Sequence, residues 1–456
     1  MRITTLFSIL ALGSVAHAAK WYEEMQIGPA WSNTFADQRG VAAVKGILVD
    51  LGDGHRALFD TETLRYVSAY QGDLEWGGTP WTGAHGQLMK LRNGSDEVFH
   101  TSEGPGWSDP GGSFDDPRPV AGRPYGNLPH ARFKGFFRHG EKIVFDYEIN
   151  GTRVLDHPAI VDGKFVRYLQ VAPHAEPLVA RLADGSGATF SASAGATVTA
   201  DADTRMTLAP ASETTRVAIV AGDQAVKPIP LDNAITGGPG LWQDTLRTQA
   251  EVSSDKKSAW VADTLPLPED NPWKSNLRFG GFDFLDADTA VLSTWNGDVW
   301  VVRGLEKTGA LQWKRFASGL FEPLGVKVVD GTIHVNGRDQ ITKLHDLNGD
   351  GEADHFEVFN RDVFVSPNFH EFAFDLQTDA DGNFYYSKAA PVRPGGRGFD
   401  TILPHHGTVI RVSPDGSSSE VLATGLRAPG GLGIGPNGEV TTGENEGTWQ
   451  PCCKIN

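Results

Sequence analysis

Short apolar runs separated by glycine, aspartate, asparagine and proline recur along the chain, without a long amphipathic helical pattern. Apolar and polar residues partly alternate at 142–149. Asn150-Gly151 follows, and then a second apolar run. Asn-Gly between two such runs is the strongest short signal for a β-hairpin. The pattern therefore predicts an antiparallel β domain, a β-sandwich, over residues 19–252, with a helix only near 240–251.

From about Leu277 the pattern changes to a loose repeat of strand, tight turn, strand and a longer excursion to a further strand. The Asp-Gly or Asn-Gly turns of this repeat lie at 296–298, 330–331, 379–382 and 436–438. Repeats of about 40 to 50 residues built in this way predict the blades of a β-propeller, although periodic turns also occur in sandwiches. Because a propeller must close its ring and the sequence stops inside the fourth unit, we expect an incomplete propeller.

The stretch between these two patterns is rich in proline and charge, which is typical of an exposed connection. The sequence thus predicts an all-β protein with a sandwich, a linker at 253–275 and a partial propeller at 276–456. High glycine and proline contents, with 12 Trp and 24 Phe, agree with many short strands rather than long helices.

The first residues read as an export signal. Arg2 precedes an apolar stretch at 6–15, and Ala16-His17-Ala18 has the small-x-small form of a cleavage site. We therefore expect a signal peptide at 1–18 and a soluble protein exported to the periplasm or the extracellular space. An uncleaved anchor or a buried strand is the alternative interpretation. The apolar run is too short to span a bilayer, and no later stretch approaches that length, so no membrane span is expected.

The net charge of the protein limits the classes of partner that it can bind. Forty basic residues against 57 acidic ones give a formal net charge of -17, which disfavours nucleic-acid binding because that needs a basic face.

The two cysteines, Cys452 and Cys453, are adjacent. Adjacent cysteines can bridge only through a strained small ring, so no ordinary disulfide is predicted.

One segment has the spacing of a cation-binding loop. Oxygen side chains occupy loop positions one, three, five, nine and twelve, Gly351 occupies the sixth position where a sharp turn is needed, and the carbonyl of the seventh residue is a backbone ligand. Hard oxygen ligands at this spacing suit Ca²⁺, here in a hairpin loop between two strands rather than between two helices. The alternative is an acidic solvated turn without an ion. The predicted metal-site residues are Asp346, Asn348, Asp350, Glu352, Asp354 and Glu357.

Three stretches of the repeat resemble blade motifs of the soluble quinoprotein glucose/sorbosone dehydrogenase superfamily: 295–300, 407–412 and 425–432. The C-terminal part is most similar to large exported propeller proteins catalogued as dehydrogenases, which a c-type haem domain often follows. Two N-terminal stretches, 104–110 and 139–144, resemble an uncharacterised domain that precedes such propellers. The resemblance implies oxidation of a sugar or polyol with pyrroloquinoline quinone (PQQ), and a c-type cytochrome as electron acceptor. This chain has no Cys-x-x-Cys-His haem motif.

The resemblance also points to two residues. His370 stands at the start of a predicted inner strand, where it could take the hydroxyl proton of a sugar as a general base. The family's histidine is usually followed by Gly-Arg, whereas Glu371 follows here, and a structural histidine is the alternative. Arg427 matches an arginine that the family places against its quinone, with Ala428 where the family has Asn. A loop arginine paired with an acidic neighbour is the alternative.

Two functions are consistent with these patterns. The first is oxidation of a sugar or polyol in the propeller. The second is a non-catalytic protein that binds a glycan or a protein partner, with exposed aromatic side chains such as Trp76, Trp81 and Trp107 stacking on sugar rings. Convergence of His370, Arg427 and other polar groups on one pocket would favour the enzyme.

Overall fold

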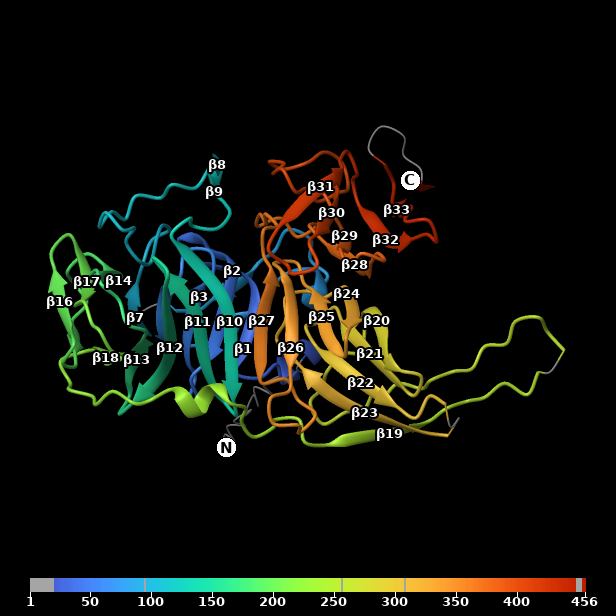
Figure 1. Ribbon diagram of the computed structural model, residues 1–456, viewed down its shortest axis with the longest axis horizontal. Coiled ribbons are helices and arrows are strands. Elements are labelled where there is room, and N and C mark those ends of the chain that lie inside the picture. The colour runs from blue at the N-terminus through green and yellow to red at the C-terminus, as the bar shows by residue number, and fades with distance from the viewer. Residues whose placement is uncertain (1–19, 94–95, 256, 307–308, 448–452) are drawn as a thin grey trace, which may run out of the picture.

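The computed structural model describes residues 20–93, 96–255, 257–306, 309–447 and 453–456. The predicted signal peptide at 1–18 lies outside these residues. The protein is all-β, as expected (Figure 1). Its helices are single turns, α1 (Trp21–Glu24), α2 (Thr79–Thr82) and the 3₁₀ turn η2 (Asp232–Ile235). Among the described residues, no helix is both long and apolar enough to cross a membrane.

The N-terminal part is a sandwich of two large, mainly antiparallel sheets with a small third sheet beside them (Figure 1). The first sheet is built, in spatial order, from β5 (Leu74–Glu75), β6 (Met89–Leu91), β1 (Ala30–Asp37), β2 (Gly40–Asp50), β3 (His55–Asp60), β4 (Arg65–Gln71) and β7 (Glu97–His100). The second begins with β15 (Phe190–Ala192), β18 (Thr215–Ala221), β13 (Lys164–Val171), β12 (Thr152–Val161), β11 (Lys142–Ile149) and β10 (Ala131–His139). The third contains β14 (Leu178–Asp184), β17 (Asp203–Leu208) and β16 (Ala196–Ala200).

Aromatic side chains from the facing sheets fill the sandwich core. Phe59 of β3 stacks on Phe145 of β11 with ring centroids 4.3 Å apart. The predicted hairpin is present: β11 and β12 pair from Ile149 and Thr152 outward, and both turn residues, Asn150 and Gly151, have positive φ. A two-residue turn of this kind matches the right-handed twist of the strands it joins.

The C-terminal part forms propeller-like blades, each an antiparallel meander (Figure 1). The first blade consists of β20 (Phe279–Asp286), β21 (Thr289–Thr294), β22 (Val299–Arg303) and β23 (Ala310–Ala317). The second consists of β24 (Gly325–Val329), β25 (Thr332–Asn336), β26 (Ile341–His345) and β27 (His355–Asn360). The third consists of β28 (Ala373–Thr378), β29 (Phe384–Lys388), β30 (Thr408–Val412) and β31 (Ser419–Ala423). The fourth has β32 (Pro429–Ile434), β33 (Val440–Glu444) and β34 (Lys454–Ile455).

The first strand of each blade is its inner strand. β20 lies beside β24, β24 beside β28, and β28 beside β32, which is the radial arrangement of propeller blades. The residues that lead into these inner strands consequently gather at one end of the propeller. This end carries both His370, just before β28, and Arg427, just before β32.

The sandwich and the propeller share one sheet. β10 pairs antiparallel with β27, so that the sandwich sheet and the second blade form a single ladder of ten strands. A strand from the N-terminal range also joins the first blade: β19 (Thr245–Gln249) pairs with β23. The helix expected near 240–251 was therefore wrong, because this segment completes the outer edge of a sheet instead.

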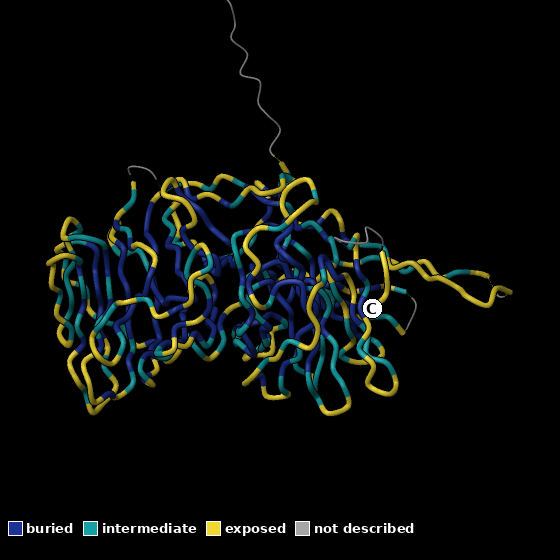
Figure 2. The backbone as a smooth tube through the Cα atoms, turned by 90° about the horizontal axis from the view of Figure 1, so that it is seen from above, coloured by how far each residue is buried: buried dark blue, intermediate teal, exposed yellow. Residues whose placement is uncertain are grey.

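A long excursion follows β19. It runs away from the body of the protein and returns, with Glu251 and Thr264 paired across it (Figures 1 and 2). The tip is exposed, including Trp260 at 92% relative exposure, whereas Trp273 at the returning end is buried against the first blade. The predicted linker at 253–275 therefore includes both the exposed tip and a buried anchor.

Candidate functional site

A cavity with a volume of 510 Å³ lies between the two parts of the protein. Loops of the N-terminal part supply one wall, and the loops before β28 and after β29 of the third blade supply the other. Its lining combines hydrogen-bonding and aromatic groups, among them Arg123, Tyr125, Asn368, Phe369, Asp400 and Thr401. Such a lining can orient a small polar molecule and also stack on it.

Aromatic stacking joins the two walls of this cavity. The ring of His85 stacks on Phe369 with centroids 4.8 Å apart. Tyr125 meets Phe364 edge to face at 4.9 Å. Because each pair joins an N-terminal loop to the third blade, the walls are held in place by side-chain packing.

Asn368 connects the cavity to His370. Its Oδ1 accepts a hydrogen bond of 2.8 Å from the backbone N–H of His370. Its Nδ2 donates to Asp400 at 2.6 Å, and Asp400 also accepts from Arg393 at 3.0 Å. The cavity lining and the histidine therefore belong to one hydrogen-bonded unit.

His370 is half-buried beside the cavity and is held in one tautomer. Its Nδ1 lies 3.3 Å from the carbonyl oxygen of Ala390. A carbonyl can only accept, so Nδ1 carries the proton and Nε2 does not. Burial lowers the pKa of His370, and the nearby charge of Arg427 lowers it further. The imidazole is therefore neutral at neutral pH, which is the state that a general base requires.

Arg427 lies close to His370 through Ala390, whose backbone N–H donates to the carbonyl of Arg427 at 2.8 Å. The guanidinium is buried and donates to the carbonyls of Gly396 and Asn445 at 3.0 and 3.2 Å. The Glu446 carboxylate is 3.8 Å away. The structure thus brings His370 and Arg427 together, but neither residue is part of the cavity lining.

A buried charge cluster lies directly behind His370. Glu371 is fully buried, with its Oε2 3.0 Å from Nε2 of His406 and 3.6 Å from Nζ of Lys388. Nδ1 of His406 accepts from the backbone N–H of Leu403 at 3.0 Å, so its proton faces Glu371 on Nε2. Burial raises the pKa of Glu371, but His406 and Lys388 outweigh it and bring it to about 2.

Sequence reasoning missed this cluster, although it noted Glu371 as a departure from the resembling family. Lys388 ends the apolar strand β29, and burial lowers its pKa to about 8. Two signals could have found the cluster: a glutamate just before the apolar inner strand β28, and a lysine that ends the apolar neighbouring strand β29. Because a charge is rarely buried without a partner, a buried glutamate predicts a buried cation near it, and a buried lysine predicts a buried carboxylate.

The predicted calcium loop is a tight turn whose carboxylates accept backbone hydrogen bonds. The two oxygens of Asp346 accept from Gly349 at 2.7 Å and from Gly351 at 2.8 Å. Asp350 accepts from the N–H of Glu352 at 3.0 Å. The same oxygens are the predicted Ca²⁺ ligands. Asp346, Asn348 and Asp350 lie in one turn, and their side-chain oxygens are the type of ligand that calcium prefers.

Asn348 and Asp354 attach this turn to the chain that leads into β19. Nδ2 of Asn348 donates to the carbonyl of Gly238 at 2.6 Å. Asp354 accepts from the N–H of Gly238 and from that of Leu347, both at 3.0 Å. Both residues therefore act as structural anchors of the loop.

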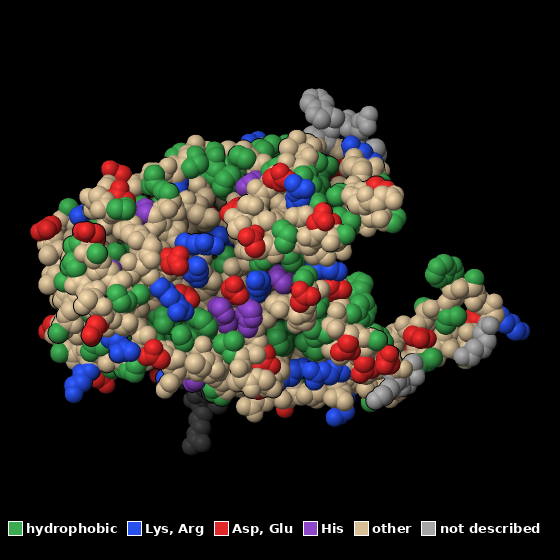
Figure 3. Space-filling view, in the orientation of Figure 1, with side chains coloured by type: hydrophobic (Ala, Val, Ile, Leu, Met, Phe, Trp, Pro, Cys, Tyr) green, Lys and Arg blue, Asp and Glu red, His purple; other side chains and the backbone are tan. Residues whose placement is uncertain are grey.

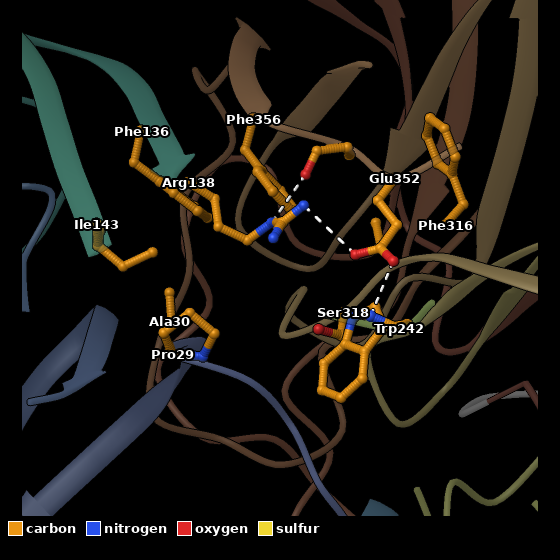
Figure 4. Close-up of a pocket in the computed structure, with 12 residues that line it drawn as sticks. Pro29, Ala30, Phe136, Arg138, Ile143, Trp242, Phe316, Ser318, Glu352 and Phe356 are labelled. Atoms are coloured by element: carbon orange, nitrogen blue, oxygen red, sulfur yellow. Dashed lines mark hydrogen bonds and ion pairs between the residues drawn. The ribbon is translucent and has the colours of Figure 1, made fainter. Parts of the chain in front are cut away.

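Glu352 points into the seam between the two parts (Figure 4). Its carboxylate accepts from the backbone of Trp242 at 2.8 Å and from Nζ of Lys314 at 2.9 Å, and Nη2 of Arg138 lies 3.5 Å away. Glu352, Trp242 and Arg138 border an internal cavity of 10 Å³. The side chain of Glu352 is an ion-pair partner here, while the calcium prediction concerns its carbonyl.

Glu357 lies on β27, and its carboxylate faces two histidines. Its Oε2 is 2.7 Å from Nε2 of His345, and His355 is the third member of the group. Among the described residues, the loop carboxylates of Asp346, Asp350 and Asp354 form no such close group. The Glu357 carboxylate thus belongs to a group that contains none of the other predicted calcium ligands.

The expectation of exposed tryptophans in the sandwich was wrong. Trp107 is completely buried, and Trp81 is 6% exposed. Trp76 packs in the same aromatic cluster, 5.1 Å from Trp81. These rings build the core and do not form a platform for a sugar.

Residues 57–156 match the model of a family described as a domain of unknown function, DUF6797. Both N-terminal stretches that carry the sequence resemblance, 104–110 and 139–144, lie within this match. The search of curated proteins found no match.

Among solved structures, one neighbour is a Thermus thermophilus protein described provisionally as an oxidoreductase (glucose dehydrogenase). It has 14% identity and a TM-score of 0.31, and the match covers 40% of this chain and 64% of that one. An auxiliary nutrient binding protein from Bacteroides ovatus has 11% identity and a TM-score of 0.25, covering 60% of this chain and 65% of that one. This chain thus spans less than two thirds of each of these two structures.

Proposed function

We propose that the protein binds a sugar or polyol in the cavity between the sandwich and the third blade. The observation that carries this proposal is the lining: Tyr125 offers a partly exposed aromatic ring, and Asn368 and Asp400 offer fixed polar groups. Aromatic faces stack on sugar rings, and carboxylate and amide groups orient hydroxyls. The volume of 510 Å³ is in the range of small-molecule sites.

The binding test uses the purified full chain and a panel of aldoses and polyols, followed by isothermal titration calorimetry. Tyr125→Ala and Asn368→Ala should weaken saturable binding, because they remove the aromatic ring and a polar anchor of the lining. Trp260→Ala is the matched control, since this exposed ring lies outside the cavity and its loss should leave affinity unchanged. Absence of saturable binding to every sugar and polyol in the panel would remove the proposal.

A second candidate function is oxidation of the bound alcohol. The observation that favours it is His370, a neutral imidazole with an unprotonated Nε2, whose backbone N–H is hydrogen-bonded to the cavity residue Asn368 although its ring does not line the cavity. In this function His370 accepts the hydroxyl proton of the substrate. PQQ, when bound, supplies the hydride acceptor. Guanidinium chemistry suits a quinone oxygen or a carboxylate, so Arg427 is the residue we assign to that group. A c-type cytochrome would then take the electrons.

The alternative is a non-catalytic protein that binds a glycan or a protein partner through the same surface. The two functions differ in one measurement, which is quinone-dependent turnover by the full chain with added PQQ and Ca²⁺. Turnover that depends on His370 favours the dehydrogenase, and saturable sugar binding without turnover favours the binding protein. Export to the periplasm or the extracellular space is part of both proposals.

A further inference from the structure

Two histidines and a glutamate lie on one face of the second blade. His345 of β26 and His355 of β27 are direct cross-strand partners. Glu357 follows two positions later on β27, and side chains two positions apart in a strand point to the same face. Strand register alone therefore brings these three side chains together.

The three side chains are close enough to share an ion. One ligand atom from each lies within 4.8 Å of the other two. Nε2 of His345 is 2.7 Å from the Glu357 carboxylate, and the two imidazole rings lie 5.3 Å apart. Nε2 of His355 is buried without a hydrogen-bond partner among the described residues. A buried polar atom without a hydrogen-bond partner is unusual, and a bound ion is one recognised reason for it.

The donor set fits a transition metal better than calcium. Zn²⁺ binds imidazole nitrogen and carboxylate oxygen at about 2.0–2.2 Å, often with three protein ligands and water in the fourth position. Tetrahedral bonds of that length place ligand atoms about 3.4 Å apart, so only small side-chain shifts are needed. Ca²⁺ prefers oxygen ligands throughout.

The surroundings position the ligands and set the expected affinity. The ring of Phe137 stacks on His355 at 4.0 Å and fixes its orientation. Burial lowers the pKa of His355 to about 4, which leaves the imidazole neutral. Lys343 lies 4.0 Å from Glu357, and the charge of Arg153 also reaches His355, so two cations oppose the ion. These charges weaken binding without removing the donor set.

We propose that His345, His355 and Glu357 bind one divalent transition-metal ion, with Zn²⁺ as the reference ion and an open position toward solvent. Figure 3 shows histidine side chains gathered on the face that carries β26 and β27. The ion replaces the Nε2 proton of His345 that now faces Glu357. It also joins β26 to β27 beside the pairing with β10, at the junction of the two parts.

The test is Zn²⁺ titration of the full chain without an affinity tag, after treatment with a chelator. The unmodified protein should bind one equivalent, release a proton on binding and melt at a higher temperature with Zn²⁺. The variants His345→Gln and Glu357→Gln, which keep the size of the side chain, should each lose this equivalent. Co²⁺ should give the visible spectrum of a four- or five-coordinate site in the unmodified protein only.

His100→Gln is the matched control. His100 lies near Asp37 and Glu97 in a second group of ligand atoms, but Arg39 already pairs with both carboxylates. This variant should keep the equivalent. Circular dichroism of each variant in the presence of chelator checks the fold. Unchanged Zn²⁺ stoichiometry in the His345→Gln and Glu357→Gln variants, or no binding to the unmodified protein, would overturn the proposal.

Discussion

Lys388 and Glu371 form a fully buried ion pair, with Nζ 3.6 Å from Oε2, directly behind the histidine of the candidate site. Removing one partner of a buried pair leaves an uncompensated charge, which costs about 3–5 kcal/mol. Glu371→Gln should therefore lower the free energy of unfolding by about this amount, measured by urea denaturation. Glu269→Gln, at an exposed position, is the control and should have no measurable effect.

The same carboxylate gives a pH prediction. The pKa of Glu371 is about 2 in the folded protein against 4.5 in its ordinary state. The unfolded chain thus binds the proton first as pH falls, so this contribution to stability is present above pH 4.5 and is lost toward pH 2. Melting temperatures measured across this range should fall more steeply for the unmodified protein than for Glu371→Gln. Parallel curves would contradict the assignment.

His370→Ala tests the proposed oxidation. A general base typically contributes 10²–10⁴-fold, so turnover should fall by about that factor while sugar binding persists. The measurement is quinone-dependent turnover of the full chain, with calorimetric binding of the same substrate as the second readout. If turnover survives the substitution, His370 is not the base.

Calcium binding by the loop has its own test. A ligand that binds only the folded state raises the melting temperature, so Ca²⁺ should stabilise the unmodified protein. The double variant Asp346→Asn with Asp350→Asn should lose this dependence, because both loop carboxylates are removed. A melting temperature of the unmodified protein that never responds to a calcium chelator would show that the loop is an ordinary acidic turn.

Substitution of Gly135 tests how closely the backbones of β10 and β27 pack. Gly135 has φ +130°, and an added Cβ would lie 2.1 Å from the backbone oxygen of Phe356. Gly135→Ala should therefore destabilise the protein by several kcal/mol through strain and a backbone clash. Gly151→Ala separates the two causes, because Gly151 also has positive φ but open space around it. Equal urea midpoints for the two variants would contradict a clash at the seam.

The export signal predicts where the mature chain begins. Cleavage after Ala16-His17-Ala18 places the new N-terminus near Ala19. N-terminal sequencing of protein secreted by an expressing cell checks this. A start at Met1 would mean that the segment is retained.

Local signals predicted most of the fold. Asn150-Gly151 gave the correct hairpin because two positive φ values select a two-residue turn. Asp330-Gly331 did the same between β24 and β25. The pairing of β10 with β27 could not be predicted in this way, since the partners are far apart in sequence and no local pattern selects them. The segment 240–251 was misassigned for the same reason: its conformation depends on the edge of β23.

The candidate site shows the same limit. Spacing along the loop assigned Glu357 to the ligands of a calcium ion, but strand register sets it opposite Lys343, on the same face of the hairpin as the His345–His355 pair. Side-chain direction in a hairpin depends on the residue at which the strand begins, and the spacing of residues along the loop does not specify that residue. His370 and Arg427 lie at the same end of the propeller because both precede inner strands of adjacent blades, but neither lines the cavity.

The ten-stranded ladder has a consequence for how a ligand reaches the cavity. Proteins that close around a ligand by swinging two lobes need a flexible connection between them. Here a rigid-body rotation would break the backbone hydrogen bonds between β10 and β27. A ligand that needs more room must therefore displace individual wall side chains, for example by loosening the packing of Tyr125 against Phe364. The speed of ligand exchange should accordingly depend on those few residues and be insensitive to the rest of the interface.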